Sequence, residues 1–346
     1  MATFHTIVTH ESPHFDEILG IWLLRKFGEK VFSGISTAEI KFWGTGGQSP
    51  DGRSAKQYEQ EGVLLIGVGN GRFDEHPAVN GERKEHECAA TLVAKALGLR
   101  DEPVFERIFK FAINSDLKAE NHPFDIASIA KVFYQQTSDP EEVINWVMKG
   151  IGAKYQEQLQ FFNVTKKEFE EKADVEEIQG PRRTIKMVSV VSDNPLMNRF
   201  ARSVHGANAD IVIQKRCSGN VQIFTNTKSG LILYAVAQML RLTEQELKND
   251  VRTKDWKMLA SEGKVEGAEE WFFQVAGQML LNGSLTATQV PATKISFEKI
   301  KEIVRIGVNP QRFEPKHTER CKRNKCPWYK FGLRRCRQIR YEARPS

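Results

Sequence analysis

The 346-residue sequence lacks several features that would place it in a specialised class of protein. Its longest apolar runs fall well short of the roughly 20 residues that a membrane-spanning helix needs, so no membrane protein is expected. The N-terminal segment has no basic region followed by a long apolar core, which a secretory signal would have. Five cysteines are too few for a disulfide scaffold in a chain of this length. We therefore expect a cytoplasmic protein in a reducing compartment.

The sequence also lacks the motifs of two common phosphate-binding loops. Gly67, Gly69 and Gly71 follow an apolar run, but their spacing is G-x-G-x-G and Arg72-Phe73-Asp74 comes next in place of a helix start. This pattern does not match the dinucleotide-binding fingerprint, and the sequence contains no G-x-x-x-x-G-K-[ST] run. Neither a dinucleotide enzyme nor a P-loop enzyme is predicted.

The composition is that of a soluble globular protein, and its charge is unevenly distributed. Hydrophobic residues make up 40% of the chain and charged residues 27%, and the length favours two domains or one large one. The net charge is +6, yet residues 310–346 contain 12 Lys and Arg against 3 Glu, a net of +9. The rest of the chain therefore carries −3, and the basic character belongs to the C-terminal segment.

Near the N-terminus, residues that bind metals separate two apolar segments. The run 4–8 predicts a strand, and 18–27 predicts a helix. Between them lie His10, His14, Asp16 and Glu17. Sites form at the carboxyl ends of strands in open α/β sheets, and mixed imidazole and carboxylate ligands suit Mn²⁺, Fe²⁺ or Zn²⁺. The alternative is that both histidines lie on the surface and the two acids interact favourably with the helix dipole.

A second group of ligand residues follows the next predicted strand, 63–68. This group is Asp74-Glu75-His76, with Glu85-His86-Glu87 nearby. Joined in space to the first group, these residues would complete a centre of one or two metal ions. Such a centre clamps the oxygens of a phosphoryl transfer and lowers the pKa of bound water. The alternatives are a polar turn at 74–76, a charged helix start at 85–87 and a helix-terminal role for Asp116.

The remaining pattern predicts helices in the first half and a mixture in the second. A strand is expected at 38–42 and a loop at 44–53. Helices are expected at 87–97, at 105–113 ending at 114–116, at 126–135, and from 140 to 162 and onward to about 175. A boundary follows at Gln179-Gly180-Pro181. Beyond it we expect strands at 185–191, 209–214 and 220–225, the last two as a hairpin, and helices at 231–240, 271–281 and 295–304. Thr243-x-x-Glu246 has the pattern of a capping box that begins another helix.

The motif His10-x-x-x-His14-x-Asp16-Glu17 after a strand resembles the first motif of the DHH phosphoesterase superfamily. Arg72-Phe73-Asp74-Glu75-His76 lies where the Asp-His-His motif of that superfamily would lie. The helix 89–93 and Ser115-Asp116 are similar to its later elements, and 206–213, 219–231 and 280–285 resemble it more loosely. The resemblance covers about residues 5–305 and is strongest to the branch of the melanocyte-proliferating-gene exonuclease.

This resemblance implies a fold, an activity and a set of site residues. The fold class is α/β: a DHH-like parallel-sheet domain at 1–178, a smaller α+β domain at 180–308 that closes over the crevice, and a basic Cys-rich appendix at 309–346. The implied activity is metal-dependent hydrolysis of phosphodiester bonds in single-stranded nucleic acid or short oligonucleotides. Mn²⁺ is the expected cofactor, with Mg²⁺, Fe²⁺ or Zn²⁺ as alternatives. The implied metal ligands are His10, His14, Asp16, Asp74 and Asp116. Glu75 is a replacement ligand or base, and His76 a general acid or a hydrogen-bond donor to a ligand.

Two departures from the family pattern bear on the chemistry. Gly67 stands where the family has a metal-bridging aspartate, and Glu75 stands in place of the middle histidine of Asp-His-His. Loss of a bridging carboxylate should weaken a two-metal site, because two close cations need anionic ligands between them. Two alternatives therefore remain beside the hydrolase: a catalytically decayed nucleic-acid-binding protein, and a hydrolase of a small phosphorylated metabolite. The oligomeric state stays open, including a homo-oligomer.

The C-terminal segment contains a separate cluster of ligand residues. Its pattern H-x₃-C-x₄-C-x₉-C is compatible with a structural zinc site formed by His317, Cys321, Cys326 and Cys336. An iron–sulfur cluster and free thiols are the alternatives. Cationic and aromatic side chains in this segment suit phosphates and unpaired bases: Lys322, Arg323, Lys325, Trp328, Tyr329, Arg334, Arg335 and Arg337. A basic tail that contacts a protein partner is the other interpretation.

Overall fold

The computed structural model describes residues 3–44, 49–76, 86–284 and 287–308. The chain divides into two compact units, Met1–Phe162 and Asn163–Ser346, and each is described by itself. This division precedes the predicted boundary at Gln179-Gly180-Pro181, where Gln179 ends the first strand of the second unit and Gly180 and Pro181 follow it. Among the helices that the structure describes, none is both long and apolar enough to cross a membrane.

The first unit is built on a small parallel sheet. Its strands are β1 (Thr6–His10), β2 (Glu39–Trp43) and β3 (Val63–Leu65), in the order β2-β1-β3. All pairs are parallel, and Ile7 of the central strand faces Ile40 on one side and Leu64 on the other. Helix α1 (Phe15–Phe27) makes the crossover that a parallel pair requires. The α/β class with a parallel sheet is confirmed for this part of the chain.

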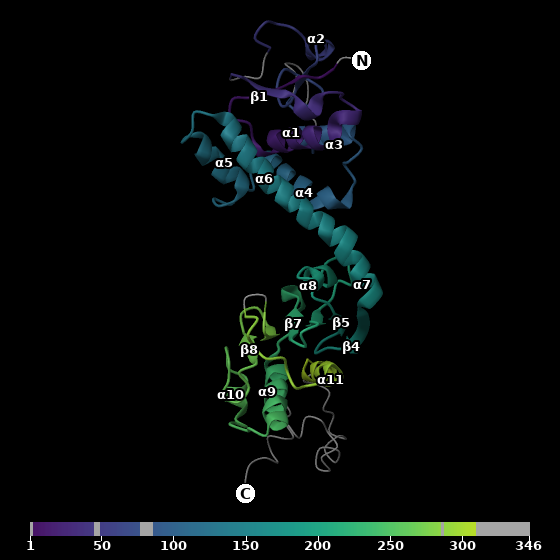
Figure 1. The fold of residues 1–346 in the computed structure, drawn as a ribbon, viewed down its shortest axis with the longest axis vertical. Helices are drawn as coiled ribbons and strands as arrows, with labels where there is room; N and C mark the ends of the chain where they lie inside the picture. Colours follow the sequence, from purple (N-terminus) through teal and green to yellow (C-terminus); the bar gives the residue numbers. More distant parts are fainter. Residues whose placement is uncertain (1–2, 45–48, 77–85, 285–286, 309–346) are drawn as a thin grey trace. The chain divides into compact units, whose positions relative to one another are not determined.

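Helix α1 is the centre of the first unit. Residues Phe15 to Leu24 are all buried, so the helix is covered on every side and not on one stripe only. It packs against α3, α4 and α6, and Figure 1 shows α1 and α3 side by side. The other helices of the unit are α2 (Ala55–Gln60), α3 (Ala89–Ala96), α4 (Glu106–Leu117), α5 (Ile126–Tyr134) and α6 (Pro140–Leu159). Short 3₁₀ turns occupy Gly28–Lys30, Ile35–Thr37 and Pro103–Phe105.

The second unit contains a mixed sheet of six strands. The strands are β4 (Asp174–Gln179), β5 (Thr184–Val191), β6 (Ile211–Lys215), β7 (Val221–Thr225), β8 (Trp271–Gln274) and β9 (Met279–Asn282), in the order β4-β5-β6-β7-β9-β8. Only β5 and β6 are parallel. The helices are α7 (Lys166–Lys172), α8 (Met197–Ala201), α9 (Tyr234–Lys248), α10 (Trp256–Leu259) and α11 (Phe297–Gly307), and a 3₁₀ turn spans Thr227–Ser229. Helices α9 and α11 pack together over the larger of its two apolar cores.

Several expected elements are wrong, for local reasons. Residues 271–281, expected as a helix, form the hairpin β8–β9. Trp271 and Phe273 are buried while Phe272 is exposed, which is the period of a strand. Thr243 and Glu246 lie inside α9 and begin no new helix. The long helix expected to continue to about 175 changes to a π-helical turn at Gln160–Thr165 and ends at Lys172.

Candidate metal centre

Three segments of the first unit converge on one group of acidic side chains. Asp16 and Glu17 lie in the first turn of α1, directly after β1 and a short loop. Asp74, Glu75 and His76 follow Phe73, which forms a parallel bridge with Ile66 beyond the end of β3. Asp116 lies in the last turn of α4. The helix was expected to end at 114–116 and ends at Leu117, so this aspartate reaches the cluster from the last turn of a helix.

One group consists of three carboxylates from three segments. Asp16, Glu75 and Asp116 each offer an oxygen, and these oxygens lie within 4.8 Å of one another. Asp16 is 3% exposed and Glu75 is 2% exposed. The Oε2 atom of Glu75 is buried without a hydrogen-bond partner in the structure. Buried carboxylates this close repel one another, and a buried oxygen without a partner costs free energy, so a bound cation would relieve both.

Two further groups adjoin this one and share its members. His14, Asp16 and Glu17 form one, and Asp74, Glu75 and His76 form the other, each with ligand atoms within 4.8 Å. Asp16 and Glu75 thus each belong to two groups. The donor set is mostly carboxylate with imidazole at its edge, which suits hard or borderline divalent cations such as Mg²⁺, Mn²⁺, Fe²⁺ or Zn²⁺. The part of the chain that the structure describes therefore contains acidic clusters able to bind a divalent metal.

Backbone donors orient the carboxylates. The Ala89 N–H, at the start of α3, donates to Oδ2 of Asp16 at 3.1 Å. The Asn70 N–H donates to Oδ2 of Asp74 at 2.8 Å, and the His76 N–H donates to its Oδ1 at 3.0 Å. The ring Nδ1 of His76 lies 2.9 Å from the same Oδ1. If Nδ1 carries the proton, Nε2 of this exposed ring is left to exchange protons with a ligand.

Glu17 belongs to the site but is not among the predicted metal ligands. It is 4% exposed, and its Oε2 accepts a hydrogen bond from the His14 N–H at 2.6 Å. Its Oε1 accepts from Thr9 Oγ1 at 3.3 Å and lies 2.5 Å from Nδ1 of His10. In the sequence, Glu17 stands three residues after His14. An acid at that position is typical of a capping box and of a favourable interaction with the helix dipole, so the pattern did not single out Glu17 as a metal ligand.

His10 is oriented toward Glu17. The hydrogen bond to Glu17 raises the pKa of His10, against the opposing effect of burial, and the charge of Glu17 adds to the increase. Among the described residues, His10 is in none of the three groups whose ligand atoms lie within 4.8 Å. Of the predicted ligands, the structure brings His14, Asp16, Asp74 and Asp116 into these groups, together with the predicted catalytic residues Glu75 and His76. The predicted tail residues lie outside the described residues.

Gly67 has φ +65° and lies against Glu17. A Cβ at this position would lie 2.2 Å from Oε1 of Glu17. The carboxylate of Glu17 therefore fills the space into which a side chain at residue 67 would point. A carboxylate from α1 thus lies beside residue 67, which has no side chain of its own.

Burial shifts the proton affinity of the central carboxylates. Burial first, and then the charges of Glu17, Asp116 and Glu75, raise the pKa of Asp16 well above its usual range. Burial raises the pKa of Glu75 to about 7. Burial also raises the pKa of the nearby Cys88 thiol to about 12, so Cys88 does not supply a thiolate nucleophile at neutral pH.

These shifts predict how the stability of the metal-free protein depends on pH. Glu75 holds its proton in the folded state up to about pH 7 and releases it near 4.5 when unfolded. The folded state is therefore disfavoured progressively as the pH rises from 4.5 to 7, by about 3 kcal/mol in total. Urea unfolding in EDTA between pH 4.5 and 8 should show this decline. Glu75→Gln should remove the part of this decline that comes from Glu75, leave the part that comes from Asp16, and be more stable than the natural protein at pH 8.

Glu39→Gln is the matched control for that measurement, because Glu39 is an exposed residue of β2 in the same unit. It should leave the decline with pH unchanged. An equal decline in the Glu75→Gln protein would contradict the assignment of this titration to Glu75.

Comparisons with known proteins do not assign a family. No protein-family model matches the sequence, and no curated protein matches it. Among solved structures, the chain is similar to an uncharacterized protein from Helicobacter pylori G27, with 11% identity over 88% of this chain and 99% of that one, at a TM-score of 0.25. A TM-score this low does not establish a common fold.

Proposed function

We propose that this protein is a metal-dependent phosphoesterase that hydrolyses phosphodiester bonds in single-stranded nucleic acid or short oligonucleotides. The observation that carries the proposal is the group of Asp16, Glu75 and Asp116, with the buried Oε2 of Glu75 left without a hydrogen-bond partner. The resemblance of the His10-x-x-x-His14-x-Asp16-Glu17 motif to the DHH superfamily supports the choice of phosphoester chemistry. A DHH-like assignment of the first unit is part of the proposal.

The proposed roles follow from burial and exposure. Asp16, Glu75 and Asp116 hold the cation, Mn²⁺ in the first instance, with His14, Glu17 and Asp74 at its edge. When bound, the cation supplies positive charge to phosphate oxygens and activates water. His76 is exposed and held by Asp74, so it is placed to donate a proton to a leaving oxygen. The basic segment 309–346, with a net charge of about +9, holds the phosphate backbone of the substrate.

Two residues of the site favour a competing function. Gly67 and Glu75 replace an aspartate and a histidine of the family pattern, and they favour a decayed enzyme that binds nucleic acid without cleaving it. Retained metal binding without hydrolysis would identify this case.

The test uses the full chain, freed of metal by EDTA and then dialysed. Mn²⁺ binding is measured by calorimetry, and hydrolysis by release of labelled nucleotides from single-stranded RNA and DNA. We expect Mn²⁺ to bind and to switch on hydrolysis. Asp16→Ala should weaken Mn²⁺ binding more than about tenfold, since it removes a ligand shared by two groups, and should abolish hydrolysis.

Asp101→Ala is the matched control, because Asp101 is an exposed aspartate of the same unit. It should keep both Mn²⁺ binding and hydrolysis. Hydrolysis that survives in Asp16→Ala would show that the site is elsewhere. Mn²⁺ binding without cleavage of either polymer, but with cleavage of small phosphate esters, would favour a metabolite hydrolase.

A further inference from the structure

The second unit contains a pocket that is separate from the candidate metal centre. Its volume is about 690 Å³, and it is formed by the turn after β4, the segment before α9 and the C-terminal end of α11. This volume lies within the range of small-molecule sites, about 300 to 1,000 Å³. The pocket therefore has room for a small organic ligand.

The wall of the pocket is mostly apolar. It includes Ile185 and Leu231, which are buried, and Ile232, which is 39% exposed. Pro181 and Val308 also line it. A ligand that fills this space would remove apolar surface from water, which is favourable in proportion to the area covered. The wall thus selects a ligand with an apolar body.

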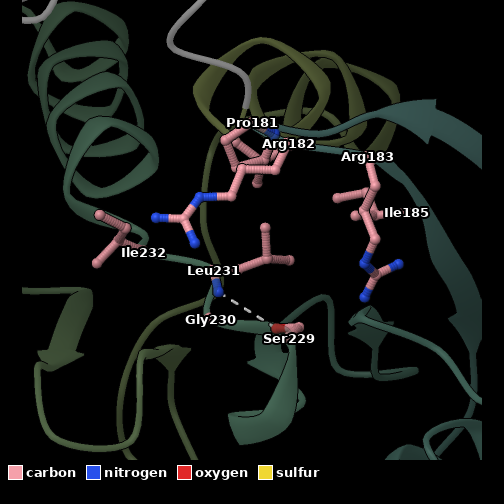
Figure 2. A pocket seen from close by; sticks show the side chains of 9 residues that line it. Pro181, Arg182, Arg183, Ile185, Ser229, Gly230, Leu231 and Ile232 are labelled. Atoms are coloured by element: carbon pink, nitrogen blue, oxygen red, sulfur yellow. Dashed lines mark hydrogen bonds between the residues drawn. The ribbon is translucent and has the colours of Figure 1, made fainter.

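Two neighbouring arginines line the pocket and differ in what holds them. Arg183 donates to Asp210 from Nη2 at 2.5 Å and from Nη1 at 3.1 Å, so its charge is compensated. Figure 2 shows the guanidinium of Arg182 extending away from Arg183 and toward Ile232. Arg182 is exposed, and its charge has five N–H donors to offer to a ligand.

The backbone on both sides of the opening is fixed. The turn that carries Arg182 is closed by a hydrogen bond from the Gly180 N–H to the Arg183 carbonyl at 2.9 Å, and Pro181 restricts its φ. On the opposite side, the Ser229 N–H donates to the Asn226 carbonyl at 2.9 Å, and the Leu231 N–H donates to Ser229 Oγ at 3.3 Å. The backbone segments that carry Arg182 and Leu231 are therefore each closed by hydrogen bonds.

We propose that this pocket binds a small organic anion whose apolar body lies against Leu231 and Ile232 and whose single anionic group pairs with Arg182. Among the residues that the structure describes, no acidic side chain pairs with Arg182, and one such cation at an apolar wall is complementary to one anionic group on an apolar body. Carboxylates and phosphate esters share this chemistry. The pocket lies entirely within the second unit, so the proposal does not depend on the proposed hydrolysis.

The probe is 8-anilinonaphthalene-1-sulfonate, an aromatic molecule with one anionic group, added to the full chain and followed by fluorescence. Its neutral counterpart is N-phenyl-1-naphthylamine. Arg182→Gln should weaken binding of the sulfonate about tenfold, the loss of a charge-assisted hydrogen bond, and leave the neutral probe within about twofold. Ile232→Asp should also weaken binding of the sulfonate, because it places a negative charge on the wall beside the negatively charged probe.

The controls are Arg252→Gln and Val204→Asp, exposed residues of the same unit that do not line the pocket. Both should bind the sulfonate as the natural protein does. Displacement by octanoate but not octyl phosphate would identify a carboxylate ligand, the reverse would identify a phosphate ester, and displacement by octanol alone would overturn the proposal. Equal sulfonate binding in Arg182→Gln, or equal loss in the controls, would also overturn it.

Discussion

Arg241→Met should destabilise the second unit by about 4 kcal/mol or more, because it leaves several buried carbonyls without donors. Arg241 lies in α9 and is 0% exposed. Its Nη1 donates to the carbonyls of Leu259 and Ser261 at 2.9 and 2.8 Å, and its Nη2 donates to that of Trp271 at 3.1 Å and to that of Gly263. One guanidinium thus holds the segment before β8 against α9.

The charge of Arg241 persists despite burial. Burial lowers the pKa of Arg241 to about 10, so the group stays ionised at neutral pH. The carbonyl oxygens around it provide the partial negative charge that water would provide in the unfolded chain. Methionine keeps the apolar contacts of the aliphatic part of the side chain, but it is shorter and donates no hydrogen bond. Lysine keeps the charge but lacks the planar guanidinium with its several donors. The stability of the Arg241→Lys protein should therefore lie between that of the natural protein and that of Arg241→Met.

Hydrogen-exchange mass spectrometry of the full chain would measure this effect in peptides that cover α9 and β8. Arg252→Met is the matched control, since Arg252 is 55% exposed and pairs with Asp250. It should change stability by less than about 0.5 kcal/mol. If protection falls equally in the two variants, the carbonyl contacts of Arg241 do not stabilise this part of the fold.

The burial of Arg241 could not be predicted from the sequence. An arginine in an amphipathic helix is usually exposed, and nothing in its neighbours along the chain indicates the four carbonyls that it meets, which come from residues 259 to 271. The hairpin β8–β9 was missed for a related reason. Its apolar residues lie on both faces, and a short apolar run does not distinguish a buried strand from a helix.

The first unit was more predictable because its signals are local. The apolar run before His10 and the apolar helix after Glu17 became β1 and α1, shifted by a few residues. Parallel strands bring their carboxyl ends to one edge, so Asp16 and the 74–76 segment could be expected to meet. The proximity of Glu17 to Gly67 was not predictable, because it depends on the turn geometry of residue 67 and the rotamer of Glu17.

The contact between Gly67 and Glu17 predicts a second large effect on stability. Gly67→Ala should destabilise the first unit by about 3 kcal/mol, combining the cost of a side chain at positive φ with the collision against Glu17. Gly98→Ala separates the two contributions, because Gly98 has φ +70° and a Cβ there would meet nothing within 4 Å. It should cost about 1 kcal/mol. Urea unfolding of both variants measures the difference.

A double variant assigns that difference to Glu17. In the Glu17→Ala protein, the added cost of Gly67→Ala should fall to that of Gly98→Ala, because the colliding carboxylate is gone. An unchanged cost would show that the backbone of residue 67, and not Glu17, opposes a side chain there.

Variants of Glu17 and Gly67 also test whether the carboxylate of Glu17 contributes to Mn²⁺ binding. Glu17→Ala should weaken Mn²⁺ binding about tenfold, as expected when the partner of a ligand residue is removed. Gly67→Asp in that background returns an acid to the space that Glu17 occupied, and aspartate tolerates positive φ better than most residues. Recovery of Mn²⁺ affinity in the double variant would mean that the site needs a carboxylate at this place, whichever segment supplies it. Without recovery, Glu17 acts through the hydrogen bonds that hold His10, Thr9 and the start of α1.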